Sequence, residues 1–226
     1  MPLPTPIGEI RSPGLLWCEG PHDFAFLRRM LGYLGNTEQT VRVEVFEGKD
    51  QLPDYLTTLS LRPGFDDLRV LAIVRDADEN AGAALASVTD HVKRGGLVAP
   101  DSHGQLVSGE SFDGRSRSVG IFIAPDGVAP GALESLYLQS VGEGPIVECV
   151  REFMRCVGPE LRHTRVAQFA KAEFHAWLAT CPEPGILPGQ ALDANFIDRD
   201  SPAFGPIRDF LRDLIAIASP LDRSLA

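Results

Sequence analysis

The sequence predicts an α/β protein in which helices flank a parallel sheet and a mostly helical C-terminal part follows. Three observations predict this fold class. Short apolar runs alternate with helical patterns in the first half of the chain, three of the four predicted strands end in an acidic residue, and no convincing strand follows Pro130. Such alternation is typical of parallel sheets whose strands are joined by right-handed crossovers.

The first strand is predicted at residues 15–18, where Leu, Leu, Trp and Cys form an apolar run typical of a buried parallel strand. Glu19 and Gly20 follow it directly. Pro21 then suits the first turn of a helix, because proline lacks an N–H that the first turn would leave unpaired. Apolar residues recur at helical spacing as far as Gly35, so we predict a helix that ends there.

The same strand–helix pattern repeats along the next ninety residues. Further strands are predicted at 41–46, 69–74 and 119–124. Helices are predicted at 50–59 and 80–93, where apolar residues share one helical face. Residues 100–118 are rich in Ser, Gly and Asp, and we interpret them as a loop or a weak hairpin.

The pattern changes after Pro130, where helical periodicity dominates. Helices are predicted at 132–141, 146–157, 165–180 and 204–217, with a Pro/Gly-rich loop at 181–189. We therefore expect two parts: an α/β domain at residues 13–142 and a helical C-terminal extension at 143–226 that packs on it.

Composition and charge narrow the class of protein. The formal net charge is −10, with 21 Lys and Arg against 31 Asp and Glu, which disfavours binding of nucleic acid through a broad basic face. An enzyme that approaches phosphates through bound divalent cations is still compatible with this charge. The sequence has no apolar run of membrane-spanning length and no signal peptide, so we expect a cytoplasmic protein without a membrane partner.

Acidic residues follow two of the predicted strands in a pattern that suits a metal ion. Glu19 follows the first strand, and Asp76 and Asp78 follow the third. Asp76 and Asp78 are two residues apart, so on an extended backbone both side chains would point the same way. Ligands of parallel sheets collect at the carboxyl ends of the strands, so neighbouring first and third strands would bring these acids together. Clustered carboxylates repel each other unless a cation lies between them, and their hard oxygens suit Mg²⁺ or Mn²⁺.

Structural roles are the alternative for some of these acids. Asp78 could cap the helix predicted after it, and Asp126, after the fourth strand, is more simply interpreted as a turn residue. Glu is a poor helix cap, so Glu19 is the strongest candidate for a functional role. The four cysteines form no Cys-x-x-Cys pair, and we interpret them as buried small apolar residues.

These motifs resemble the Toprim domain, a Rossmann-like fold found in topoisomerases, bacterial primases, recombination-mediator proteins and overcoming-lysogenization-defect (OLD) nucleases. The resemblance rests on the run Cys-Glu-Gly-Pro-His-Asp at 18–23 and on Asp76-Ala77-Asp78, each after a predicted strand. Its signature is a Glu after the first strand and Asp-x-Asp after a later one. The sequence looks most like a bacterial Toprim-like family of unassigned function that is related to the OLD nucleases, over residues 15–171.

The resemblance implies further site residues. It places Asp23, four residues after Glu19, and Glu134, after the fourth strand, as additional metal ligands. It places Lys171 near the phosphate of a substrate. Lys171 lies among small and apolar neighbours, so we expect a partly enclosed ammonium that needs an anionic partner. His175 lies one helical turn later and could line the same cleft, although a surface or core position is the simpler interpretation.

The chain also departs from the known members of that group. It has no room for the DNA-gate domain of a topoisomerase, no zinc ligands like those of primases and no Gly-x-x-x-x-Gly-Lys-Ser/Thr motif of an ATPase. An ATPase would therefore have to be encoded separately.

Two functions follow from the residues and the resemblance. The first is a divalent-metal-dependent nuclease that acts on DNA, or less favourably on RNA, with Glu19 and Lys171 as catalytic residues and Glu19, Asp23, Asp76, Asp78 and Glu134 as metal ligands. The second is a non-catalytic Toprim module that binds metal or nucleotide and partners an ATPase or a DNA-repair machine. The net charge favours the second, whereas the extra acids and Lys171 favour the first. A homo-oligomer is compatible with either.

Overall fold

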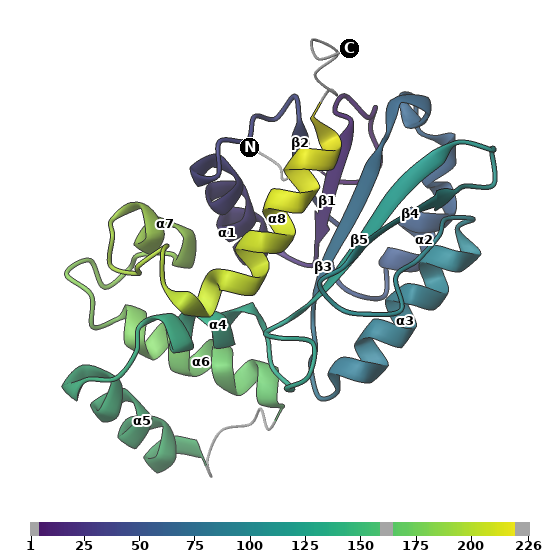
Figure 1. The fold of residues 1–226 in the computed structure, drawn as a ribbon. Coiled ribbons are helices and arrows are strands. Elements are labelled where there is room, and N and C mark those ends of the chain that lie inside the picture. The colour runs from purple at the N-terminus through teal and green to yellow at the C-terminus, as the bar shows by residue number, and fades with distance from the viewer. Residues whose placement is uncertain (1–4, 159–164, 220–226) are drawn as a thin grey trace.

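A five-stranded sheet forms the centre of the protein (Figure 1). The structure is a computed structural model that describes residues 5–158 and 165–219. The strands are β1 (Gly14–Cys18), β2 (Val41–Val45), β3 (Val70–Asp76), β4 (Leu106–Glu110) and β5 (Ser116–Ala124). The helices are α1 (Pro21–Tyr33), α2 (Leu52–Thr58), α3 (Ala81–Arg94), α4 (Leu133–Ser140), α5 (Pro145–Val157), α6 (Val166–Leu178), α7 (Pro188–Asp193) and α8 (Gly205–Ala218).

The strands lie in the order β2-β1-β3-β5-β4, and all pairs are parallel except β4 with β5. This arrangement confirms the predicted α/β class with a helical C-terminal part. Of the two alternatives for residues 100–118, the hairpin is correct: Leu106 pairs with Gly120, and Glu110 with Ser116. The weak signal has a physical reason, because β4 lies at the edge of the sheet and is only partly buried.

Helices cover both faces of the sheet, and the alternation of side chains along each strand decides which face they contact. Leu15 and Trp17 of β1 point into the core formed with α2 and α3, whereas Leu16 and Cys18 point to the opposite face. That opposite face packs against α1, the helices after Pro130 and α8, which crosses in front of the strands in Figure 1.

Two glycines allow α8 to pack directly on the sheet. A Cβ atom on Gly14 would lie 2.9 Å from the Cβ of Ala218, and one on Gly120 would lie 2.8 Å from the ring of Phe210. Both distances are shorter than carbon atoms tolerate, so a larger residue at either position would push the helix away. The helices after residue 143 thus share one core with the sheet, and the division at residue 142 stays a prediction.

The cysteines divide into two groups. Cys18 and Cys181 are buried, as expected, but Cys149 and Cys156 are exposed, so the interpretation of all four as buried apolar residues was wrong. The reason is the orientation of α5: Val147, Val150 and Met154 face the core, and the two cysteines lie on the outer side of the helix. Among residues 5–158 and 165–219, no helix has the length and apolar character needed to cross a membrane.

A buried ion pair joins β2 to the loop before β3. The carboxylate of Glu44, 1% exposed, accepts hydrogen bonds from both terminal nitrogens of Arg62 at 2.8 Å and from Trp17 Nε1 at 3.0 Å. Arg62 Nε also donates to the carbonyl of Gly8 at 2.7 Å. Since a buried charge needs a partner, the pair holds the segment before β1 against β2.

We predict that Arg62→Met lowers the free energy of unfolding by about 3 kcal/mol, because it leaves the carboxylate of Glu44 buried without its main partner. Urea unfolding followed by circular dichroism measures this loss. Arg11→Met is the matched control, because Arg11 pairs with Glu9 at 2.8 Å on the surface, and it should leave the unfolding midpoint unchanged. Equal effects of the two changes would contradict this role of the buried pair.

Candidate functional site

The sheet topology brings the predicted acidic residues to one edge. β1 and β3 are parallel neighbours in which Cys18 pairs with Val74, so Glu19 and Asp76 lie at the carboxyl ends of adjacent strands. α1 and α4 begin at the same edge and carry Asp23 and Glu134 in their first turns. Four acids from two strand ends and two helix starts therefore lie at one edge of the sheet.

Asp76 is the most connected of these acids. Its side chain is 5% exposed, and its Oδ1 accepts a hydrogen bond at 3.0 Å from the backbone N–H of Leu133, the first residue of α4. Its Oδ2 accepts a hydrogen bond at 2.8 Å from Lys171 Nζ on α6. Since helix N-termini and ammonium groups both favour a negative charge, one carboxylate holds three elements together.

Lys171 is partly enclosed and has an anionic partner, as predicted. Its side chain is 42% exposed, and its ammonium lies 2.8 Å from Asp76 and 3.9 Å from Glu134. Burial lowers the pKa of Lys171, but the charges of Asp76 and Glu134 outweigh burial and raise that pKa above its usual value. The lysine therefore stays protonated at the acidic edge of the sheet.

Glu134 is buried without a hydrogen bond to one of its oxygens. Its side chain is 2% exposed, and Oε2 has no hydrogen-bond partner within the described residues. Burial raises the pKa of Glu134 to about 7, although the ammonium of Lys171 acts in the opposite direction. At neutral pH this carboxyl group is therefore close to half protonated.

Glu19 and Asp23 are held in similar surroundings. Burial raises the pKa of Glu19, and the charges of Asp76 and Asp78 raise it further; Glu19 Oε2 is likewise buried without a described partner. Burial also raises the pKa of Asp23, helped by the charges of Asp76 and Glu134. Asp23 has a structural role as well, because its carboxylate accepts a hydrogen bond from the N–H of Gly20 at 3.0 Å and caps α1.

Asp78 differs from the expected geometry. The sequence suggested an extended backbone on which Asp76 and Asp78 point the same way, but β3 ends at Asp76 and Asp78 has a φ of 53°. Its backbone pairs with Gly131 through hydrogen bonds of 3.0 and 2.8 Å. Its carboxylate accepts a hydrogen bond at 2.8 Å from Lys49 and does not contact Lys171, so the two aspartates face different cations.

Sequence reasoning did not assign Lys49 and His22 to this edge. Lys49 follows β2, the strand beside β1. Its position directly after that strand is the feature of the sequence that could have placed it at this edge. His22 lies between two predicted ligands in sequence, with Nδ1 4.0 Å from Glu134 Oε1. The ring of His22 lies 5.5 Å from that of His175, which is exposed on α6.

In the conformations that the structure shows, the acidic side chains do not form a complete metal-binding site. Within the described parts of the chain, no three His, Cys, Asp or Glu side chains are arranged to hold one metal ion. Lys49 and Lys171 instead neutralise Asp78 and Asp76. Glu19 and Glu134 each have a buried oxygen that accepts no hydrogen bond from the described residues, and such oxygens fit a hard cation, because buried carboxylate oxygens usually accept one.

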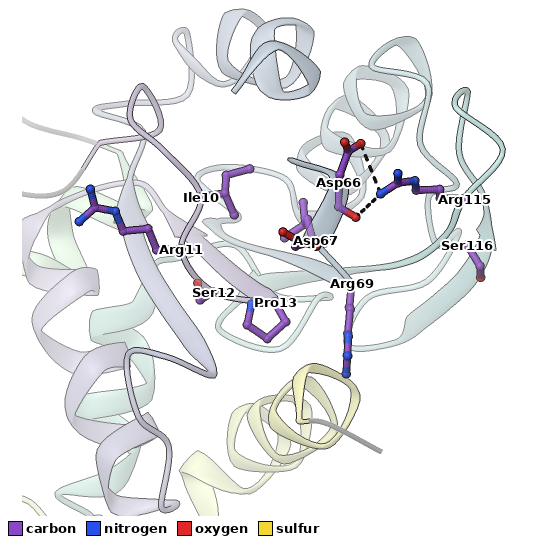
Figure 2. A pocket seen from close by; sticks show the side chains of 10 residues that line it. Ile10, Arg11, Ser12, Pro13, Asp66, Asp67, Arg69, Arg115 and Ser116 are labelled. Atoms are coloured by element: carbon purple, nitrogen blue, oxygen red, sulfur yellow. Dashed lines mark hydrogen bonds and ion pairs between the residues drawn. The ribbon is translucent and has the colours of Figure 1, made fainter. Parts of the chain in front are cut away.

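The opposite edge of the sheet carries a pocket of about 420 Å³, lined by residues 10–13, 66–69 and 115–116 (Figure 2). Its arginines are already engaged: Arg115 donates to the backbone carbonyl of Asp66 at 2.6 Å, and Arg69 donates to that of Ser219 at 3.1 Å.

At the acidic edge, Asp126 accepts hydrogen bonds from the N–H groups of Val128 and Ala129, which confirms its role in a turn.

We predict that Glu134→Gln stabilises the protein at pH 8 by about 1–3 kcal/mol and leaves its stability near pH 5 almost unchanged. A folded-state pKa of about 7 means that the native protein binds this proton more tightly than the unfolded chain does. The associated stability is present below pH 4.5 and is lost as the pH rises through 7. Urea unfolding at several pH values tests this expectation.

The matched control is Glu110→Gln, which changes an exposed glutamate on β4. It should leave the pH dependence of unfolding as in the unchanged protein. A Glu134→Gln protein whose stability falls between pH 5 and pH 8 as steeply as that of the parent would contradict the assignment of the shifted proton to Glu134.

Comparisons with known proteins give a family and two structural likenesses. Two structures of the C-terminal region of the OLD protein from Xanthomonas campestris pv. campestris, phased with iodine and with mercury, are similar to the chain at 17% and 18% sequence identity. Each comparison covers 91% of this chain and 97% of the other, with a TM-score of 0.45. A comparison with curated proteins gives no match. A family model described as "Protein of unknown function (DUF3226)" matches residues 13–216, and the chain therefore belongs to that family.

Proposed function

We propose that the protein is a divalent-metal-dependent phosphodiester hydrolase that acts on nucleic acid, with DNA favoured over RNA. One observation carries the proposal: an ammonium group, Lys171, lies among buried acids at the carboxyl edge of a parallel sheet, 2.8 Å from Asp76. Acids that hold a cation and a lysine that meets a phosphate oxygen are the parts that phosphodiester hydrolysis requires. The Toprim-like sequence motifs at the same positions support this interpretation.

Mg²⁺ or Mn²⁺ is the cation that the donor set favours, because every predicted ligand is a carboxylate. Glu19 and Asp76 would hold it, with Asp78, Asp23 and Glu134 as further ligands. The buried oxygens of Glu19 and Glu134 that accept no hydrogen bond from the described residues support this assignment. When bound, the cation would supply an activated water and stabilise the oxygen that leaves phosphorus.

The chain's own residues would position the substrate. Lys171 and Lys49 neutralise Asp76 and Asp78 in the structure, and a bound cation would take over that neutralisation. Their ammonium groups would then be available to phosphate oxygens.

A non-catalytic module that binds metal or nucleotide is the second candidate. The net charge of −10 favours it, because the chain has few basic residues with which to hold a polynucleotide. In that case the protein would act in the cytoplasm as a partner of a separately encoded ATPase or of a DNA-repair machine. Metal binding is common to both candidates, whereas cleavage of DNA belongs to the first alone.

We predict that millimolar Mn²⁺ or Mg²⁺ raises the melting temperature, because the cation relieves repulsion among carboxylates that are close only in the native state. Asp76→Asn should abolish the metal-dependent rise. Differential scanning fluorimetry with and without metal measures both. Asp101→Asn, which changes an exposed aspartate paired with Lys93, is the control that should melt like the parent protein at every metal concentration. A melting curve that metal does not move would contradict the site.

We predict that the protein cleaves plasmid or single-stranded DNA with Mg²⁺ or Mn²⁺ and that Lys171→Ala lowers the rate by about 10²-fold or more. The metal-dependent melting shift should persist, because Lys171 is not a ligand. Lys93→Ala, which removes a lysine paired with Asp101 at 3.0 Å on the surface of α3, is the matched control and should cleave normally. Metal binding without any cleavage would favour the non-catalytic module. Cleavage by Lys171→Ala at the parent rate would remove Lys171 from the mechanism.

A further inference from the structure

A further positively charged side chain, that of Arg75, lies at the acidic edge of the sheet. Arg75 is the last residue but one of β3. Side chains alternate between the two faces along a strand, so Arg75 lies on the same side as Ile73, which packs toward α2 and α3. Asp76 lies on the other side, where it meets α4 and Lys171 of α6. Lys171 and Arg75 therefore approach the edge from opposite faces of the sheet.

Glu19 is the neighbour of Arg75 on β1. The two strands are parallel, and one step beyond the last pair of their register Glu19 lies level with Arg75. Both residues continue the face that packs on α2 and α3. Burial and the charges of Asp76 and Asp78 raise the pKa of Glu19, whereas the positive charge of Arg75 lowers that pKa. The guanidinium group thus acts on one of the proposed metal ligands.

The guanidinium group of Arg75 has no anionic partner in the part of the chain that the structure describes. Its Nε is buried and donates no hydrogen bond to the described residues. The ion pairs of the acidic edge are those of Lys49 with Asp78 and of Lys171 with Asp76. Since a guanidinium group stays charged at neutral pH, this side chain is available to an anion.

Neutralisation of the acids does not explain the position of Arg75. An arginine that neutralised Glu19 would pair with it, but an oxygen of Glu19 is buried and accepts no hydrogen bond from the described residues. A divalent cation on Glu19 and Asp76 would compensate the charge of these acids and leave Arg75 with an excess positive charge. A phosphate group would match that charge, because the planar guanidinium group can donate two parallel hydrogen bonds to phosphate oxygens.

We propose that Arg75 binds a phosphate group of the nucleic acid that is adjacent to the phosphate group contacted by Lys171. This role rests on the proposed function, since a polynucleotide carries further phosphates beside the bond that is cleaved. The strand would cross the carboxyl edge of the sheet from the side of α6 to the side of α2 and α3. Contact with a few phosphates of one strand agrees with the net charge of −10, which disfavours a broad basic face.

The first test measures how tightly the full chain binds a fluorescein-labelled single-stranded DNA oligonucleotide. Fluorescence anisotropy is recorded at several salt concentrations with Ca²⁺ in place of Mg²⁺, and a gel shows that the oligonucleotide stays intact. Arg75→Gln should weaken binding about tenfold and lower the slope of log K against log salt concentration by about 0.7, the contribution of one phosphate contact on a single strand.

Arg69→Gln is the matched control, because Arg69 is exposed just before β3, at the opposite end of the same strand, and donates to the carbonyl of Ser219. It should bind the oligonucleotide like the parent protein. Equal affinities and equal salt slopes for the parent and Arg75→Gln overturn the proposed contact.

Arg75→Lys separates the charge from the planar shape of the guanidinium group. It keeps a cation, so the salt slope should stay at the parent value, and it loses the paired hydrogen bonds, so binding should weaken a few-fold. Circular dichroism shows whether each variant keeps the parent fold, and Arg75→Lys carries the test alone if Arg75→Gln does not fold. Binding as tight as that of the parent, or a salt slope below the parent value, overturns the proposed contact.

Melting temperatures with and without Mn²⁺ distinguish the role of Arg75 from the proposed function. The metal-dependent rise should persist in Arg75→Gln, because Arg75 is not a ligand. A variant that loses this rise but binds the oligonucleotide like the parent shows that Arg75 supports Glu19, and it overturns the phosphate contact while the hydrolase remains. A parent protein that metal stabilises but that binds no oligonucleotide at low salt overturns the hydrolase and the phosphate contact together.

Discussion

The carboxylate of Asp76 is the constraint on which the acidic edge of the sheet depends. A buried carboxylate must be paired, and Asp76 meets this requirement with the first N–H of α4 and the ammonium of Lys171 on α6. The same contacts fix where α4 begins, and therefore where Glu134 lies, and they hold α6 against the end of β3. Packing of apolar side chains places these helices against the sheet, but the charge pairing determines which residues meet at its edge.

Burial of the other acids at this edge destabilises the native state, and interactions elsewhere in the fold offset this effect. Glu19 and Glu134 each keep a buried oxygen that accepts no hydrogen bond from the described residues, and burial raises the pKa of both groups. Buried, unsatisfied polar groups are rare in proteins and destabilise the native state. The cores on the two faces of the sheet, together with the pair of Glu44 and Arg62, offset this cost. Strained polar groups in one place and a well-packed core around them are typical of functional sites.

Much of the fold was predictable because the buried positions of helices and strands recur in the sequence as regularly spaced apolar residues. The apolar runs of β1 and β3 and the helical spacing of α1 and α8 gave the correct elements, since each packs one continuous apolar surface. β4 was only half predicted because an edge strand buries little. At the site, strand ends were sufficient to bring Glu19 and Asp76 to one edge, but the backbone of Asp78 at φ 53° depends on its pairing with Gly131, which is 53 residues away in sequence and invisible to local patterns. Lys49 and the outward-facing cysteines of α5 depend in the same way on tertiary packing.

The glycines beneath α8 have a consequence for the order in which the protein can fold. Gly14 and Gly120 let the last helix of the described chain lie directly on β1, β3 and β5, which come from its first 124 residues. During synthesis, the part of this face that α8 covers stays exposed until α8 has left the ribosome. Completion of the core thus depends on contacts between distant parts of the chain, and such contacts form slowly. Until α8 packs on it, the incomplete sheet would be prone to aggregation or would be bound by a chaperone.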